Sequence, residues 1–360
     1  MQSKNRSTSM TQESATEPKT LEGRILSGLR GHYEIASLTE NQPGVRLYSG
    51  TDLATDSPVL VKEYYSFWWT AVEMQHMEAA LRPLETIELH SGGVQDFRLL
   101  IPQDMFVSVK DQRCYMVLRS PHHPGQSLKH YLESQGRLST PTVRHFLSQV
   151  LQSLWFLHGQ MVDFADGETQ KGTAHGNLTL ESLLIVPESQ AWTDQFQVYL
   201  RDFTLWESVV KPEMLSTRSL NEQKQQDLRD LGTIATQMLL GELNPPGYWN
   251  PIQDPRWNTI ADQSLKQFIQ QLLGIEALPF SRAKAARNQL LALPAIEEPQ
   301  ETETNTEWES IGIGQADRPP LYFKIAFGVA ILGLVANLGL LWINKGAMQP
   351  PKFDFIQQRK

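Results

Sequence analysis

The hydrophobic pattern of this chain changes character once along its length. Between about residues 31 and 120, short β-branched or aromatic runs such as "HYEIASL" and "SPVLVKEYY" alternate with Gly, Pro and Asp turn residues, a pattern typical of strands. One stretch, "TAVEMQHMEAALRPLE", is helical instead, because Met77, Leu81 and Leu84 recur on one face. After residue 126 helical patterns dominate. A small β-rich part followed by a larger helical part predicts an α+β domain with two lobes.

The later helices carry recognisable ends and apolar stripes. "SLKHYLESQG" ends at a glycine suited to a C-cap, and "TPTVRHFLSQVLQSLWFLHGQ" offers Thr140 as N-cap with Pro141 at the first helical position. Two further amphipathic helices are predicted in "DLRDLGTIATQMLLGE" and "QSLKQFIQQLLGI". The stripe expected to face the core in the long helix consists of Phe146, Val150, Leu154 and Leu157.

Composition narrows the class of protein. A net charge of −8 without a dense Lys/Arg run argues against a nucleic-acid partner. The single cysteine, Cys114, excludes an intramolecular disulfide and suits a reducing compartment. It lies in the apolar run "CYMVL", so we expect a buried, unreactive thiol. No Cys or His spacing resembles a metal site.

Both ends of the chain differ from the middle. Residues 1–22 are polar and lack an apolar core of signal-peptide length, which predicts a disordered tail. Residues 295–320 hold six Glu and few large apolar side chains, so we expect a linker between a domain at 23–294 and whatever follows.

Residues 325–343, "IAFGVAILGLVANLGLLWI", contain no charged side chain. As a helix this run spans about 28 Å, close to the roughly 30 Å hydrocarbon core of a bilayer. We therefore predict one transmembrane helix over 321–344 and a short tail at 345–360. Gly333 and Asn337 lie one turn apart within it, which would favour self-association of the span.

Six segments, in order over residues 31–293, resemble a eukaryotic-type (Hanks-type) serine/threonine protein kinase. "VLVKEY" looks like the strand that carries the phosphate-binding lysine, and "CYMVLRSPHHPGQSLKHYL" like the hinge and the helix after it. "HGNLTLESLLI" and "YLRDFTLWE" are similar to the catalytic loop and the metal-binding turn. The last two segments place Asp227 at the aspartate that buttresses the catalytic loop and Arg282 at the arginine of the closing helix. The resemblance implies a bilobal kinase-like fold, with an N-lobe at about 31–120 and a C-lobe at about 121–294.

The departures from the kinase pattern argue against catalysis. Phosphoryl transfer needs a glycine loop over the phosphates, a lysine, two metal-binding residues and an aspartate base. Here Val45 stands at the last loop glycine, Asn177 at the base and Ser182 at the second metal ligand. An amide cannot accept a proton near pH 7. Gly176 replaces the catalytic-loop arginine and Thr204 the last glycine of the metal-binding turn. No catalytic residue is expected.

What survives of a nucleotide site, by the resemblance, is Lys62, Asp202 and Leu118, with Asp202 the remaining metal position. No cofactor is expected, and ATP with Mg²⁺ is the alternative. The sequence leaves open which glutamate pairs with Lys62: Glu73 lies on the face of Met77 and Leu81, whereas Glu78 has the more usual separation from the lysine.

The favoured hypothesis is a degenerate, bacterial-type pseudokinase, anchored by 325–343, that binds a protein partner of unknown identity. The alternatives are an atypical kinase of low activity and an ATP sensor without transfer. Positive charges after the span favour a cytoplasmic tail, but that would move a large domain across the membrane without a signal, so we expect the kinase-like domain in the cytoplasm. The rings of "YYSFWW", Tyr64 to Trp69, are expected to be mostly core, with an exposed partner patch as the alternative.

Overall fold

The computed structural model describes residues 19–66, 69–84, 88–89, 98–121, 123–163, 169–188, 195–244, 250–275 and 278–295. The chain divides into two units, Met1–Glu297 and Glu298–Lys360, and every described residue belongs to the first. No helix within these ranges has the length and apolarity needed to cross a bilayer. The predicted span at 325–343, nearly all of the linker and most of the N-terminal tail lie outside the described residues.

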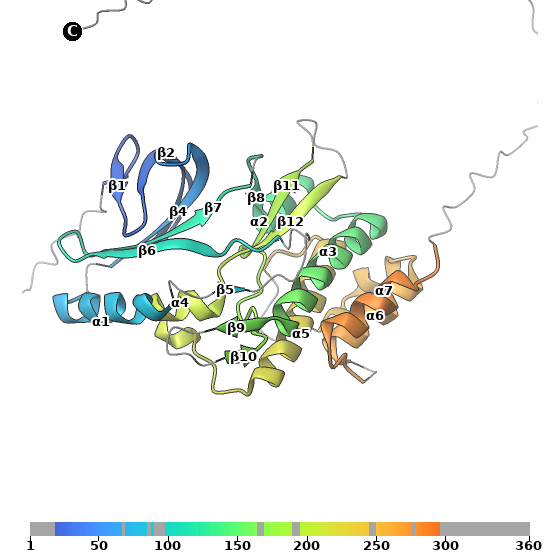
Figure 1. Ribbon diagram of the computed structural model, residues 1–360. Helices are drawn as coiled ribbons and strands as arrows, with labels where there is room; N and C mark the ends of the chain where they lie inside the picture. Colours follow the sequence, from blue (N-terminus) through green and yellow to red (C-terminus); the bar gives the residue numbers. More distant parts are fainter. Residues whose placement is uncertain are drawn as a thin grey trace, which may run out of the picture. The chain divides into compact units, whose positions relative to one another are not determined.

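A six-stranded antiparallel sheet forms the N-lobe (Figure 1). Its strands, in spatial order, are β1 (Ile25–Ser27), β2 (His32–Gln42), β3 (Val45–Asp52), β4 (Ser57–Tyr65), β7 (Arg113–Arg119) and β6 (Pro102–Ser108). Neighbouring side chains point to opposite faces, and both faces are covered. On β4, Leu60 packs in the large core that continues into the C-lobe, whereas Val59 and Val61 pack in a second core on the other face. This explains why the run "VLV" at residues 59–61 is continuously apolar rather than alternating.

The second core is closed by the start of the chain. Leu21 is fully buried in it, beside Tyr33 of β2 and Phe106 of β6. Asp104 of β6 accepts hydrogen bonds from the Tyr33 hydroxyl at 2.8 Å and from the backbone N–H of Arg30, in the β1–β2 turn, at 2.9 Å. The two ends of the sheet are therefore joined, which curves it around the core.

Helix α1 (Ala71–Leu81) begins at a capping box formed by Thr70 and Glu73 and is followed by the 3₁₀ turn η1 (Arg82–Leu84). Its buried residues are Met74 and Leu81. Met77, in the predicted stripe, is half-buried. Met74 lies one turn before Met77 on the same face, so the predicted face is confirmed and extends further toward the start of the helix.

The C-lobe is mainly helical and also contains two small sheets, with strand orders β10-β9-β5 and β12-β11-β8 (Figure 1). The strands are β5 (Glu88–Leu89), β8 (Gln126–Ser127), β9 (Met161–Asp163), β10 (Thr169–Lys171), β11 (Leu183–Pro187) and β12 (Phe196–Leu200). The helices are α2 (Leu128–Gln135), α3 (Thr140–Gly159), α4 (Thr204–Val210), α5 (Leu220–Leu240), α6 (Gln263–Leu273) and α7 (Ala283–Leu291). Short 3₁₀ turns are η2 (Pro212–Met214), η3 (Pro251–Gln253) and η4 (Pro255–Thr259).

The helices predicted in the C-lobe are present, but α5 begins at Leu220 rather than at the predicted Asp227, and one cap differs. Ser139, not Thr140, is the N-cap of α3, because the Ser139 hydroxyl accepts the N–H of Thr142. The predicted core stripe of α3 is confirmed, since all four side chains are fully buried. The leucines of the catalytic-loop segment are also buried: Leu178, Leu183 and Leu184 are 4%, 0% and 3% exposed.

The other burial predictions are also confirmed where the structure describes them. Cys114 is buried on β7, and burial raises the pKa of its thiol to about 12, so it stays protonated. Tyr64 and Tyr65 are buried, which leaves them out of any exposed aromatic patch. The neighbouring residues 67–68 lie outside the described ranges.

Candidate functional site: the cleft between the lobes

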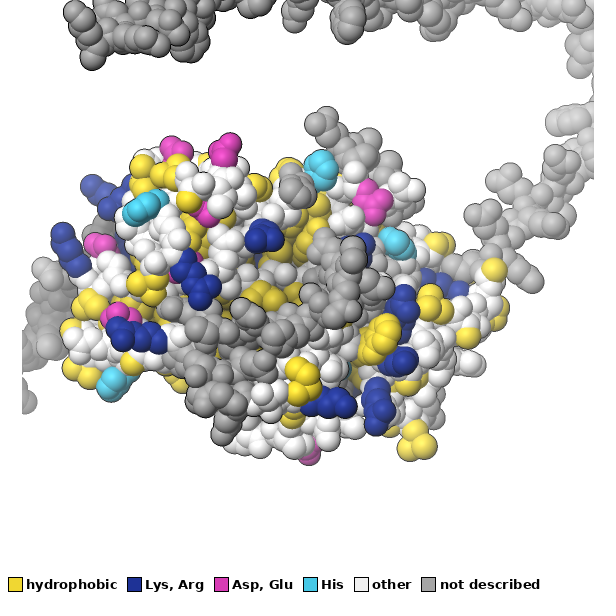
Figure 2. All heavy atoms as spheres, in the orientation of Figure 1, with side chains coloured by type: hydrophobic (Ala, Val, Ile, Leu, Met, Phe, Trp, Pro, Cys, Tyr) yellow, Lys and Arg dark blue, Asp and Glu magenta, His cyan; other side chains and the backbone are white. Residues whose placement is uncertain are grey.

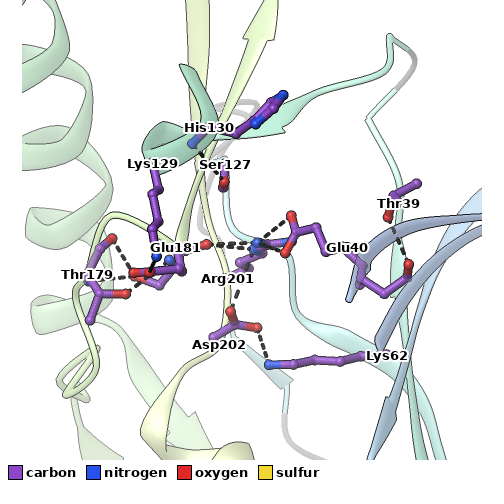
Figure 3. A network of polar contacts seen from close by, with 12 residues as sticks. Thr39, Glu40, Lys62, Ser127, Lys129, His130, Thr179, Glu181, Arg201 and Asp202 are labelled. Carbon is purple, nitrogen blue, oxygen red and sulfur yellow. Dashed lines mark hydrogen bonds and ion pairs between the residues drawn. The ribbon is translucent and has the colours of Figure 1, made fainter. Parts of the chain in front are cut away.

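Lys62 projects from the middle of β4 toward the C-lobe. Its ammonium donates hydrogen bonds to Asp202 Oδ1 at 2.7 Å and to Glu207 Oε1 at 2.7 Å. The side chains of Lys62, Asp202 and Glu207 are 10%, 12% and 1% exposed. One amine thus joins two carboxylates in a largely dry site, and Figure 3 shows its contact with Asp202.

Neither glutamate proposed from the sequence pairs with Lys62. Glu73 is exposed and accepts hydrogen bonds from Thr70 as part of the α1 capping box. Glu78 contacts Arg82 at 3.5 Å on the surface, with 42% of its side chain exposed. Glu207 takes the position instead, because α4 begins directly after Asp202 and turns this residue toward β4.

The surroundings hold these groups ionised. Burial alone would lower the pKa of Lys62, but the carboxylates of Asp202 and Glu207 outweigh it and raise that pKa above its usual value. Burial alone would raise the pKa of Asp202, but Lys62 and Arg201 lower it below its usual value. The Tyr64 hydroxyl donates a short hydrogen bond to Glu207. Burial and then the charge of Glu207 raise the pKa of Tyr64 well above normal, so it remains a donor.

Asp202 has a left-handed backbone with φ 64°, which is uncommon for a residue other than glycine. The contacts around it fix this geometry. The side-chain amide of Asn177 donates to the Asp202 carbonyl at 3.0 Å, and the Phe203 ring packs 4.7 Å from that of His175. The backbone N–H of Thr204 donates to the His175 carbonyl at 2.9 Å. Asn177, at the base position, therefore supports the turn.

Gly176 and Thr204 are fitted to one another. Gly176 has φ 73°, and a Cβ placed on it would lie 2.6 Å from Thr204 Oγ1. A larger side chain at residue 176 would collide with the start of α4, so the glycine is a condition for this position of α4. Gly176 and Thr204, which both depart from the kinase pattern, therefore belong to one structural feature.

Ser182 is turned inward, away from any metal position. It is 1% exposed. Its hydroxyl accepts the backbone N–H of Thr179 at 2.8 Å and donates to the Thr179 carbonyl at 3.1 Å. Asp202 has one oxygen on Lys62 and the other 3.6 Å from Arg201. The described residues contain no group of three His, Cys, Asp or Glu side chains suited to a metal. The residues at the metal positions thus do not fit Mg²⁺ in this arrangement.

A tight hairpin replaces the glycine loop. β2 and β3 are joined by Pro43 and Gly44, with Gln42 paired to Val45. Gly44 has φ 77°, as position three of such a turn requires. The Gly44 carbonyl accepts the N–H of Tyr65 at 3.0 Å, which ties the turn to the end of β4.

This hairpin is also clamped to the C-lobe. Arg201 donates to both oxygens of Glu40 on β2 at 2.8 Å, as Figure 3 shows. Arg201 is 2% exposed and also donates to the Glu181 carbonyl at 2.8 Å. The space where phosphates would enter is a cavity of about 210 Å³. Four carboxylates line it, together with three cations: Glu40, Glu181, Asp202 and Glu207 with Lys62, Arg201 and Lys211.

A second cavity of about 580 Å³ opens on the hinge side of the same cleft, between Leu47, Leu60 and Leu184. Leu118 is not part of this lining: it is 1% exposed and is paired with Leu60 on the neighbouring strand. Of the three residues expected to bind nucleotide, the structure thus brings Lys62 and Asp202 together and buries Leu118 beside Leu60.

Asp227 holds the catalytic-loop segment from below, in the role that the resemblance implies. Its carboxylate accepts the backbone N–H groups of His175 and Gly176, both at 2.8 Å, and contacts His158 Nε2 at 2.8 Å. Burial lowers the pKa of His175, so this fully buried ring is neutral and structural.

Sequence reasoning missed Glu207, Glu40 and Arg201. Glu207 had one usable signal, because it stands within the apolar run "LWESVV". A buried carboxylate there requires a cation partner. Glu40 and Arg201 had no local signal, since they meet only after the lobes close on each other.

Comparison with known proteins gives the class of the fold. No protein-family model matches the chain, and no curated protein sequence matches it. Solved structures do match. The PknI kinase domain of Mycobacterium tuberculosis matches with TM-score 0.50 and 13% identity, over 77% of this chain and 100% of that one. The PAN3 pseudokinase of Neurospora crassa matches with TM-score 0.52 and 10% identity, over 74% of this chain and 63% of that one.

The protein therefore contains a protein-kinase-like domain, with a β-rich N-lobe and a helical C-lobe. At these identities the similarity establishes the fold alone. The matching structures include both a kinase domain and a pseudokinase, so only the residues of the cleft indicate whether this domain is catalytic.

Proposed function

We propose that the domain is a pseudokinase: it transfers no phosphate and serves as a membrane-anchored module that binds a protein partner. The observation that carries this proposal is the pairing of Lys62 with Glu207 as well as Asp202. Two of the three N–H donors of Lys62 are already used on Asp202 and Glu207, so a phosphate at the lysine would have to compete with two carboxylate charges.

The chemistry that remains is insufficient for transfer even if α4 moved. Asn177 cannot remove a proton from a hydroxyl, and Ser182 offers one neutral oxygen already used within its own turn. General-base catalysis typically contributes about 10²–10⁴-fold. The domain lacks the base, the second metal ligand and the flexible glycine loop. These three losses together argue against slow phosphotransfer as well as fast phosphotransfer.

A small-molecule sensor without transfer is the second candidate. The cavity of about 580 Å³ at the hinge favours it, because its size lies in the range of ligand sites and leucines line its walls. Such a sensor would bind through the hinge side and leave the ion pairs of Lys62 intact.

Phosphotransfer is tested on the purified full-length chain with labelled ATP, Mg²⁺ and generic protein substrates. We expect no transfer above that of Asp202→Asn, which retains an acceptor for Lys62. Transfer that is present in the wild type and lost in this folded variant would establish the low-activity kinase instead.

The membrane anchor is part of the proposal. Residues 325–343 would cross the bilayer once, with the kinase-like domain in the cytoplasm and residues 345–360 on the far side, and Gly333 and Asn337 would support self-association. The PAN3 pseudokinase, solved in complex with PAN2, is a precedent for a partner-binding role of this fold. Protease added to intact spheroplasts should spare the domain and remove an epitope fused after Lys360. Digestion of the domain with survival of the epitope would reverse the topology.

A further inference from the structure

A further cavity lies away from the cleft, on the C-lobe. It measures about 620 Å³ and is lined by the end of α3, the turn after β10, the start of α5 and the start of α7. Its charged lining residues are all basic: Lys171, Lys224, Arg282 and Lys284. Figure 2 shows Lys and Arg side chains, without Asp or Glu among them, gathered beside α7 on this face.

These cations come from separate segments and converge without carboxylate partners. Among the described residues, none of the four forms an ion pair. Lys284 lies 5.2 Å from the centroid of the half-exposed Trp155 ring, which holds the ammonium at the cavity wall. Lys224 donates to the carbonyls of His158 at 2.9 Å and Lys171 at 3.2 Å, so two of its three N–H donors are accounted for.

The first turn of α7 adds to the positive potential. Arg282 is its N-cap and makes no side-chain capping bond, and the turn contains no acidic residue. The contrast with α1 and α5 is direct, because both of those helices begin with a Glu in a capping box. A helix N-terminus carries a partial positive charge, so four cations around an uncapped one repel each other unless an anion is present.

Burial, together with the nearby charge of Lys171, lowers the pKa of Lys224. Neither neighbouring carboxylate of α5 lines the cavity. Glu222 accepts hydrogen bonds from Ser219 in the capping box, and Asp227 is buried and bonded to His158 and two backbone N–H groups.

We propose that this basic pocket binds a small phosphate-bearing anion, with Lys171, Lys224 and Arg282 as its ligands. The volume of about 620 Å³ lies in the range of small-molecule sites, which favours a small, densely charged molecule over an extended acidic peptide. The site is separate from the cleft and does not depend on the proposed pseudokinase function.

The test is titration calorimetry of the full-length chain with pyrophosphate, at constant ionic strength. The test variant is Lys171→Gln with Arg282→Gln, because both side chains are exposed and Lys224, which has structural bonds, stays in place. The control is Lys110→Gln with Arg24→Gln, which removes the same charge from exposed N-lobe positions.

We expect saturable binding in the wild type and the control, and about a tenfold or larger rise of Kd in the test variant, because two charged donors to the anion are removed. Three results would overturn the proposal: no saturable binding, an equal loss in both double variants, or a loss caused instead by Lys62→Arg in the cleft. Binding of a phosphopeptide without binding of pyrophosphate would assign the pocket to a macromolecule and also overturn it.

Discussion

The cleft and the basic pocket both gather cations, but only the cleft pairs them. In the cleft, Lys62 and Arg201 contact Asp202, Glu207 and Glu40 at 2.7–2.8 Å. In the pocket, none of the described acidic side chains lines the cavity beside the four basic ones. A buried charge is costly unless it is paired, whereas an exposed one is tolerated alone. The charges of the cleft therefore stabilise the fold by pairing with one another, whereas the charges of the pocket remain open to an anion.

The largest effect on the free energy of unfolding is expected from Lys62→Met. The substitution keeps the length of the side chain but leaves Asp202 and Glu207 as uncompensated buried carboxylates, which typically costs about 3–5 kcal/mol. Urea unfolding measures the loss. The control is Lys129→Met, since Lys129 pairs with Glu181 at 36% and 37% side-chain exposure and should change stability by less than about 1 kcal/mol. Equal losses in the two variants would remove the distinction between structural and surface charges.

Leu183→Ala tests whether the catalytic-loop segment is anchored in the core. Leu183 is 0% exposed, and truncation of such a leucine costs about 2–5 kcal/mol. The matched variant, Leu215→Ala, removes a side chain that is 66% exposed and should shift stability by no more than about 0.5 kcal/mol. An unchanged unfolding free energy for Leu183→Ala would contradict the packing of this loop.

Glu40→Gln should have a smaller effect, because the Glu40 side chain is 26% exposed. We expect a loss of about 1 kcal/mol and faster hydrogen exchange in the β2–β3 hairpin, which would be released from Arg201. Glu34→Gln, on an exposed position of the same strand, is the control. If hydrogen exchange in the hairpin were equal in the two variants, the clamp between the lobes would be refuted.

The smallest effect concerns the pH dependence of stability, to which Lys62 and Lys224 should contribute with opposite signs. The pKa of Lys62 is raised, so its contribution to stability is complete below pH 10.5 and is lost as pH rises through the higher folded pKa. The pKa of Lys224 is lowered, so the folded state binds fewer protons than the unfolded chain between that pKa and 10.5, and stability increases with pH there. Lysine side-chain NMR titration should place the two pKa values on opposite sides of 10.5. Two values on the same side would contradict the contrast between the sites.

Much of the fold could be predicted from sequence because local patterns specify it. The α3 stripe follows from short-range periodicity and the glycine caps from residue type, whereas the burial of the "HGNLTLESLLI" leucines was implied by the kinase resemblance. The cleft could be predicted only in part. Lys62 and Asp202 were identifiable from their motifs, but the partner of Lys62 depends on where α4 starts, which in turn depends on Gly176 leaving room for Thr204. Such a contact between distant segments has no periodic signature.

The basic pocket was outside the reach of sequence reasoning for the same reason. Its cations are scattered from residue 171 to residue 284, and the chain as a whole is acidic. Only folding brings them together.

The most direct test of the closed cleft is the thermal unfolding of the full-length chain with and without ATP and Mg²⁺. Ligand at 100 times its dissociation constant would stabilise the protein by about 2.7 kcal/mol. Both samples carry Lys171→Gln and Arg282→Gln, so that the basic pocket does not contribute to nucleotide binding. Because Asp202 and Glu207 pair with Lys62, we expect no change in Tm at millimolar nucleotide. A rise of several degrees that disappears in Asp202→Asn would show that the cleft opens to nucleotide, and would contradict the proposal that the ion pairs of Lys62 close it.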